Sequence, residues 1–232
     1  MSPEDFRAQL QYDLEWRERE FTLLINQLSN MSQDDKKIYR KTLLVMLYSH
    51  FEGFCKFAFQ TYLKLINEER IARSDANEYI IASSLLDVFH DIEYPGNICS
   101  DIFNINSTEK KFSKFFIRTH FIRSYNEILL QDIDISDRFS SEIVDTKSNL
   151  TLKVFVKILY RLGLPYDQFD SFDSTISNLL TRRGDIAHGK KVDGIEENHF
   201  MEIEMKIFEF INSLIILLSD AARNKAFLKR EN

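Results

Sequence analysis

The chain has 232 residues, among them 6 glycines and 3 prolines, and carries a formal net charge of −6. An all-β fold needs more turn-forming residues than this chain has. The abundance of Leu, Ile, Phe, Lys and Glu favours long helices with few connections. The acidic balance excludes a protein that coats nucleic acid with its whole surface, so any RNA contact must come from a local basic patch.

The length predicts one domain spanning residues 1–232, with a core of useful size. Cys55 and Cys99 are too few for a disulfide framework or a zinc site. The N-terminus shows no secretory pattern, and apolar stretches such as 214–218 are far too short to span a membrane. We therefore expect a cytoplasmic protein that makes no membrane contact.

Three helices are predicted in the N-terminal part of the chain. The first spans Ser2–Leu28 and opens with a cap residue, a proline and two acids, which suit free backbone N–H groups and the helix dipole. The second spans Ser32–Ile66, opens with a sequence that resembles a capping box and stays apolar, so it should be central. The third runs from about Asp75 to His90.

Two segments in the middle of the chain lack clear periodicity. Residues 91–110 contain the turn sequence Tyr-Pro-Gly-Asn and are interpreted as a loop or small insertion. Residues 131–148 are acidic and rich in serine, and a weak alternation at Ile133 and Ile135 predicts a short strand or a loop.

A basic segment with interleaved aromatic residues lies between them. It could contact RNA through phosphate attraction and base stacking. The favoured interpretation is an amphipathic helix that buries its phenylalanines and solvates its lysines. Its members are Lys110, Lys111, Lys114, Phe115, Phe116, Arg118 and Arg123.

The C-terminal part predicts three further helices. The first spans about Leu150–Leu162 and stops at Gly163, and the second spans Ser171–Arg183. The last covers roughly Glu196–Phe227 and carries a continuous apolar stripe.

The end of the second of these helices combines an arginine pair, a carboxylate and a histidine with two glycines. An imidazole can move protons at neutral pH, and a guanidinium offers a planar fork of donors that can hold a phosphate. Arg183 and His188 therefore predict a phosphodiester site.

The pattern Arg183-Gly-Asp-Ile-Ala-His188-Gly resembles the R-x4-6-H motif of the HEPN superfamily, which consists of small all-helical domains, many of them ribonucleases. Two further segments resemble a prokaryotic branch of it: Leu47–Phe54, and Ser148–Leu150 followed by Leu159–Leu164. The resemblance implies an all-α, HEPN-like helical bundle. It also implies a metal-independent endoribonuclease without a cofactor, acting as a toxin or phage-defence effector restrained by an antitoxin or another inhibitory protein.

Residues five apart on an unbroken helix lie about 140° apart around its axis, so Arg183 and His188 would not share a face. Either the helix breaks, for which Gly184 and Gly189 offer two points, or a second subunit completes the site. The resemblance favours a homodimer with both motifs in one cleft.

By the same resemblance, His188 would transfer the proton in an attack by the RNA 2′-hydroxyl, and Arg183 would bind the scissile phosphate. Arg182 also satisfies the looser spacing, so either arginine can face the phosphate. Glu52 would orient the arginine, or would lie exposed on its helix.

Several neighbours complete the predicted site. The family commonly has a polar residue after the arginine where this chain has Gly184, and Asp185 can compensate from the next position. Lys190 and Lys191 would extend a positive patch for RNA, or would simply be solvated. Tyr48 shares the helix face of Glu52 and is interpreted as core. The alternative function is a non-catalytic module that dimerises or binds RNA or protein.

Overall fold

The computed structural model describes residues 1–93, 110–135, 137–190 and 193–230. Within these ranges the chain is all-α, as predicted, and only isolated β-bridges join Ala72 to Asp132 and Ala76 to Leu228. Most of the predicted loop 91–110, with Cys99, lies outside the described residues, and so does Lys191.

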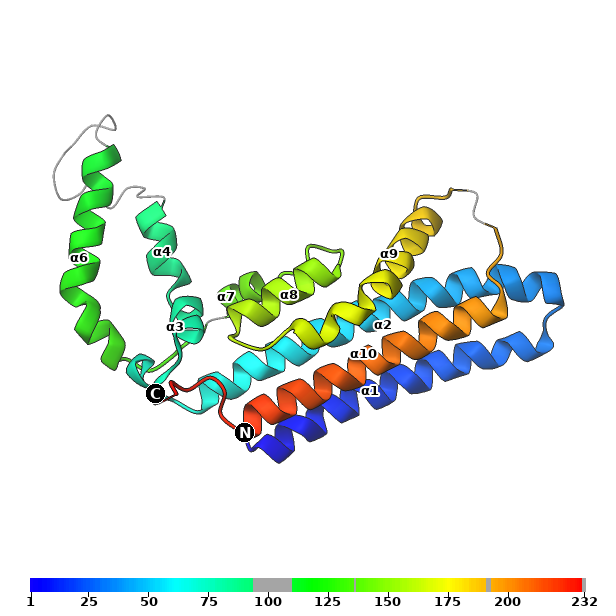
Figure 1. Ribbon diagram of the computed structural model, residues 1–232, viewed down its shortest axis with the longest axis horizontal. Helices are drawn as coiled ribbons and strands as arrows, with labels where there is room; N and C mark the ends of the chain where they lie inside the picture. Colours follow the sequence, from blue (N-terminus) through cyan, green and yellow to red (C-terminus); the bar gives the residue numbers. More distant parts are fainter. Residues whose placement is uncertain (94–109, 136, 191–192, 231–232) are drawn as a thin grey trace.

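Three long helices form the main bundle: α1 (Pro3–Asn26), α2 (Gln33–Glu68) and α10 (Glu197–Arg223). All three contact one another, and α1 runs opposite to α2 and α10 (Figure 1). The first and last helices are slightly shorter than predicted. A 3₁₀ turn, η1 (Gln27–Asn30), follows α1, and Phe227 stays buried beyond the end of α10.

Serine caps fix where the first two long helices begin. The Ser2 hydroxyl accepts from the Asp5 N–H at 3.0 Å and the Asp5 carboxylate accepts from the Ser2 N–H at 3.4 Å, which completes a capping box. The Ser32 hydroxyl likewise accepts from the Asp35 N–H at 3.2 Å. These bonds satisfy backbone donors that the first helical turn leaves free, as the sequence predicts.

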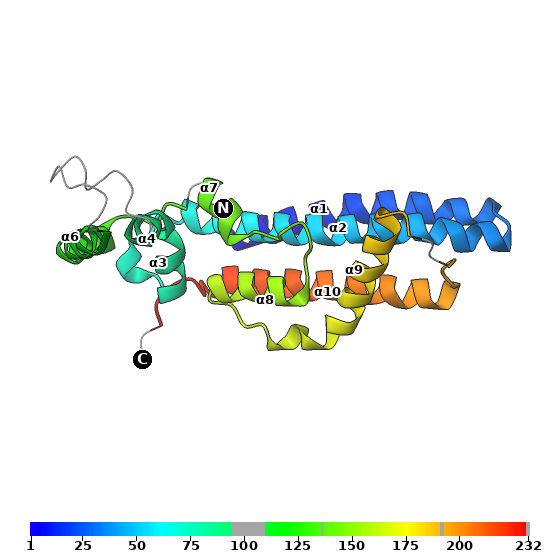
Figure 2. The same cartoon turned by 90° about the horizontal axis from the view of Figure 1, so that it is seen from above.

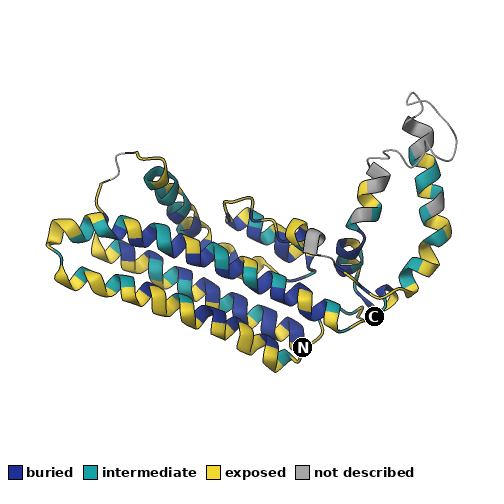
Figure 3. Ribbon diagram, turned by 180° about the vertical axis from the view of Figure 1, so that it is seen from behind, coloured by how far each residue is buried: buried dark blue, intermediate teal, exposed yellow. Residues whose placement is uncertain are grey.

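A second group of helices packs on one side of the bundle: α8 (Leu152–Arg161), the 3₁₀ helix η3 (Asp167–Phe172) and α9 (Asp173–Ala187) (Figures 1 and 2). Phenylalanines join this group to the bundle. The rings of Phe155, Phe169 and Phe210 lie 4.7 to 4.9 Å apart, and Phe51 of α2 lies 5.2 Å from Phe210. The buried faces meet between the helices (Figure 3), so this core fixes α9 against α2.

The predicted helix Asp75–His90 is interrupted in the structure. A short turn η2 (Arg73–Asp75) precedes α3 (Glu78–Ser84), and α4 (Leu86–Glu93) follows after Leu85, whose φ and ψ are −117° and 21°. Serine side chains at this break bond elsewhere: Ser84 accepts from Arg73 Nε at 3.0 Å, and Ser83 donates to the Arg161 carbonyl at 2.9 Å. Such bonds compete with a continuous helix.

The region 131–148 is only partly the strand or loop that its sequence predicts. Ile133 and Ile135 are buried, and the Ile133 N–H donates to the Ile71 carbonyl at 2.9 Å. The Asn67 side chain donates to the Ile135 carbonyl and accepts from the Ile135 N–H. Residues Asp137–Ile143 instead form a helix, α7, which contacts α2 and α3. The sequence does not predict this helix.

The basic aromatic segment forms a helix, α6 (Lys110–Leu130), as predicted, but it does not bury its phenylalanines as expected. Phe115 is 67% exposed. Among the described elements, α6 packs mainly against α4 and η2, and it projects from the end of the bundle (Figure 1). A helix with so few neighbours has no core in which to bury all its rings.

Candidate active site

The helix α9 carries both predicted catalytic residues and remains continuous through Gly184. The predicted helix end at Arg183 is wrong: the helix ends only at Ala187, His188 is its C-cap, and of the two possible break points only Gly189 is used. Gly189 then adopts a φ of +67°, and the N–H groups of Gly189 and Lys190 donate to the carbonyls of Ile186 and Asp185. These bonds form a Schellman motif, which explains why glycine stands at this position.

Arg183 lies half-buried between α9, α2 and the loop before α8. Its Nη1 donates to Asn149 Oδ1 at 3.2 Å, and its Cζ lies 4.8 Å from the centroid of the Tyr48 ring. A guanidinium over an aromatic face is held by a cation–π attraction. Within the described part of the chain Arg183 forms no ion pair, so its positive charge is not neutralised by a carboxylate.

Tyr48 supports Arg183 from the core. Its side chain is 1% exposed, and its hydroxyl accepts from the Leu150 N–H at 2.9 Å. Burial raises the pKa of Tyr48 far above its ordinary value, and the nearby Glu52 carboxylate adds to the shift.

Glu52 is half-buried one helical turn after Tyr48, so it does not lie on an exposed helix face. In the described structure it is not a direct ion-pair partner of Arg183 either. Glu52 and Arg183 both lie near Tyr48: the carboxylate raises the pKa of the Tyr48 hydroxyl, and the guanidinium stacks on the Tyr48 ring.

Asn149 is a site residue that sequence reasoning missed, although it belongs to one of the segments that carry the resemblance. It follows Lys147 and Ser148, which have φ values of 53° and 57°. The Lys147 N–H donates to Asp145 Oδ1 at 2.7 Å and the Asn149 N–H donates to the Thr146 carbonyl at 3.0 Å. This tight turn directs Asn149 towards Arg183, and no spacing rule predicts a contact across 34 residues.

The other predicted site residues near the motif have partners of their own. Arg182 Nε donates to Asn178 Oδ1 at 2.8 Å, one turn earlier on α9. Lys190 Nζ lies 2.7 Å from Asp185 Oδ1 in an ion pair. The Lys190–Asp185 ion pair is exposed, so it can rearrange at little cost when another ligand binds, whereas the Arg182–Asn178 bond is partly buried.

His188 is exposed at the end of α9. Because the helix continues from Arg183 to this C-cap, the two side chains leave its axis about 140° apart. One copy of the chain therefore does not bring both groups to the same face of α9.

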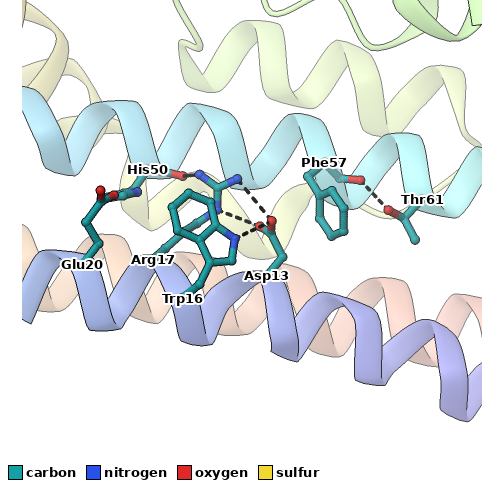
Figure 4. Close-up of polar contacts among 7 residues, drawn as sticks. All are labelled: Asp13, Trp16, Arg17, Glu20, His50, Phe57 and Thr61. Atoms are coloured by element: carbon teal, nitrogen blue, oxygen red, sulfur yellow. Dashed lines mark hydrogen bonds and ion pairs between the residues drawn. The ribbon is translucent and has the colours of Figure 1, made fainter.

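A second polar cluster lies on the opposite side of α2, at its contact with α1 (Figure 4). Arg17 donates from Nε to Asp13 at 2.7 Å, covers the Trp16 ring at 4.5 Å and reaches the His50 carbonyl at 3.4 Å. A Cβ on Gly53 would lie 2.8 Å from Arg17 Nη1, so glycine makes room for the guanidinium.

His50 is buried within this cluster. Its Nε2 lies 3.3 Å from Glu20 Oε2 without the alignment of a hydrogen bond. Burial lowers the pKa of His50, and the neighbouring Arg17 adds to that effect against the opposing charges of Glu20 and Asp13. The cluster joins two helices of the bundle and faces away from the Tyr48 side of α2.

Among the described residues, no three or more His, Cys, Asp or Glu side chains gather where they could hold a metal ion. In the same part of the chain, none of the helices combines the length and apolar character that crossing a membrane demands.

Comparison with known proteins identifies one family. The sequence model described as RiboL-PSP-HEPN matches residues 12–220, a range that includes α2, the Asn149 turn and the end of α9. No curated protein and no solved structure matches the chain.

Proposed function

The chain belongs to the RiboL-PSP-HEPN family, and we propose that it is an endoribonuclease whose active site contains Arg183 and His188. This proposal rests on the contacts and the charge of Arg183. Its guanidinium is held by Asn149 and the Tyr48 ring, yet it has no carboxylate partner among the described residues. A half-buried cation that stacks on a buried ring and has no carboxylate partner among the described residues is suited to bind a phosphate.

The proposed reaction is attack of the RNA 2′-hydroxyl oxygen on the adjacent phosphorus, which breaks the bond to the 5′-oxygen. His188 accepts the proton of the 2′-hydroxyl or donates one to the departing 5′-oxygen. Arg183 stabilises the negative charge that develops on the phosphoryl oxygens. DNA, which lacks the attacking hydroxyl, would bind without being cut.

A homodimer would place two copies of the motif in one cleft. In that arrangement one imidazole can act as the base and the other as the acid, while each guanidinium is already oriented within its own chain. This proposal rests on the family and on the angular separation of Arg183 and His188 on α9. Lys190 would add positive charge near the cleft once it leaves its ion pair with Asp185, and its sequence neighbour Lys191 stays a predicted RNA contact.

The proposed biological role is that of a cytoplasmic toxin or phage-defence effector, held inactive by an antitoxin or another inhibitory protein. A non-catalytic module for dimerisation and for binding RNA or protein is the alternative. The observation that favours it is Gly184, which leaves open space where the family commonly has a polar side chain.

Induced expression in a bacterial host tests the proposal. Wild type should arrest growth and fragment cellular RNA, whereas His188→Ala and Arg183→Ala should not. Arg182→Ala is the matched control, since it removes an adjacent guanidinium that is bonded to Asn178. Equal growth of all four strains, at equal levels of folded protein, would favour the non-catalytic module.

A further inference from the structure

The helix α6 presents an exposed face that combines aromatic and cationic side chains. Phe115 and Ile122 lie seven residues apart, within about 20° around the helix, and are 67% and 72% exposed. Tyr125 is 41% exposed, and Arg118 and Arg123, which are themselves about 140° apart around the axis, are exposed on either side of the line from Phe115 to Ile122. Phe121 anchors the helix: its ring lies 6.1 Å from Phe89 of α4 and 5.6 Å from the Tyr125 ring, one turn further along α6. The helix is thus anchored by one face and open on the other.

The charge of α6 is opposite to that of the whole protein. The helix sequence contains five Lys and Arg residues and one acid, Glu127, whereas the full chain has 30 basic and 36 acidic residues. Neither Arg118 nor Arg123 forms an ion pair within the described structure. A local excess of unpaired positive charge on an acidic protein fits a polyanionic ligand.

We propose that this face of α6 binds single-stranded RNA, with Arg118 and Arg123 on phosphates and with bases stacked on Phe115 and Tyr125. Exposed rings interleaved with cations are the combination by which proteins hold single strands without reading their sequence. A second copy of the same helix would bring like charges together. An acidic protein would satisfy the cations but would leave the aromatic rings without stacking partners.

The location of α6 makes it a binding surface separate from the candidate active site. It projects from one end of the bundle, and the C-terminal end of α9 lies towards the other (Figures 1 and 2). A long strand held at α6 would have a second attachment remote from the scissile phosphate. The choice of RNA as ligand rests on the proposed function, whereas the binding itself requires no cleavage.

Binding of labelled polyuridylate to the full chain tests this proposal, with His188→Ala as the background so that no RNA is cut. Phe115→Ala should weaken binding by about tenfold, because stacking on one ring contributes an effect of that size. Arg118→Glu with Arg123→Glu should weaken it at least about tenfold and should lower the salt slope by about 1.4, since each phosphate contact contributes about 0.7. Circular dichroism should show an unchanged helix content.

Matched controls lie on α1, where Tyr12 is 74% exposed and Arg7 and Arg19 are exposed. Tyr12→Ala, and Arg7→Glu with Arg19→Glu, should leave binding unchanged. If the α6 and α1 variants bind alike, or if the background protein binds no polyuridylate, the proposal is overturned. It is also overturned if polyglutamate displaces the RNA equally well and Phe115→Ala has no effect, which would indicate an acidic protein partner.

Cleavage is measured separately in the wild-type chain. Loss of binding by the α6 variants with no cleavage by wild type would leave this proposal standing and refute the nuclease. Cleavage by wild type together with normal binding by the α6 variants would support the nuclease and overturn this proposal.

Discussion

Tyr48 connects the hydrophobic core to the candidate active site. Its ring supports Arg183, and its hydroxyl satisfies the Leu150 N–H, so one side chain positions both the guanidinium and the turn that carries Asn149. A buried backbone donor that loses its partner costs about 1 to 3 kcal/mol.

Tyr48→Phe is therefore expected to reduce the free energy of unfolding by about 1 to 3 kcal/mol and to reduce cleavage more than RNA binding, because the Asn149 turn loses its anchor. Urea unfolding and cleavage kinetics measure the two effects. Tyr12→Phe, at a residue that is 74% exposed, is the control and should change neither quantity. A Tyr48→Phe protein with wild-type stability would show that the hydrogen bond to Leu150 contributes nothing.

His50 gives a prediction about pH. Burial lowers its pKa in the folded chain, so the unfolded chain binds the proton more readily. Its contribution to stability is therefore complete above the unfolded pKa of about 6.5 and is lost as the pH falls towards the lower folded pKa. The free energy of unfolding should fall between pH 7.5 and pH 5.5, and this fall should be smaller in His50→Gln. Burial raises the pKa of Glu18 and of Glu204. These groups change the pH dependence of unfolding equally in wild type and in His50→Gln. Equal slopes in wild type and variant would contradict the assignment to His50.

At the level of elements, α9 and the turn that ends it contain two glycines with opposite structural roles. Gly184 lies inside the helix, and a Cβ there would meet no atom within 4 Å. Gly189 has a φ of +67° and terminates the helix. Only the second position needs glycine for its backbone conformation.

Gly184→Ala should raise the free energy of unfolding by about 0.5 to 1 kcal/mol, because alanine restricts the unfolded chain and fits the open space. Gly189→Ala should lower it by about 1 to 2 kcal/mol, since a left-handed conformation strains any residue with a Cβ. Thermal unfolding followed by circular dichroism compares the two. A stabilising Gly189→Ala would contradict the Schellman motif described for this helix end.

Gly184→Asn tests whether a polar side chain at this position increases the rate of cleavage. If the missing polar group limits catalysis, this variant should cleave RNA faster than wild type at similar stability. Wild-type rates would indicate that Asp185, or no residue at all, fulfils that role. Gly184→Ala serves as the control for filling the space without adding a polar group.

Sequence reasoning located the long helices and the motif because these depend on local signals such as caps, periodicity and spacing. The predicted end of α9 at Arg183 is too early, since Gly184 permits a helix to end without requiring it, and α9 packs against α2 up to its end at Ala187. Sequence reasoning missed Asn149 because that contact with Arg183 exists only in the tertiary structure. It assigned Phe115 to the core because periodicity identifies an apolar face but not whether anything covers it.

For the whole molecule, the separation of Arg183 and His188 around α9 predicts that the active form contains more than one chain. Light scattering at micromolar concentration should give twice the 27.5 kDa mass of the chain. His188→Ala should have the same mass, because the proposed loss of activity is chemical and not a failure to assemble. An active wild-type protein that stays monomeric would require both groups to act from one chain, contrary to the geometry of α9.

The pairing of Asn149 and Tyr48 with Arg183 has a genetic consequence. The three residues come from well-separated stretches of the gene, and two of them need not touch RNA at all. A selection for cells that survive expression of the protein should therefore recover missense changes clustered around codons 48, 149 and 183, in addition to codon 188.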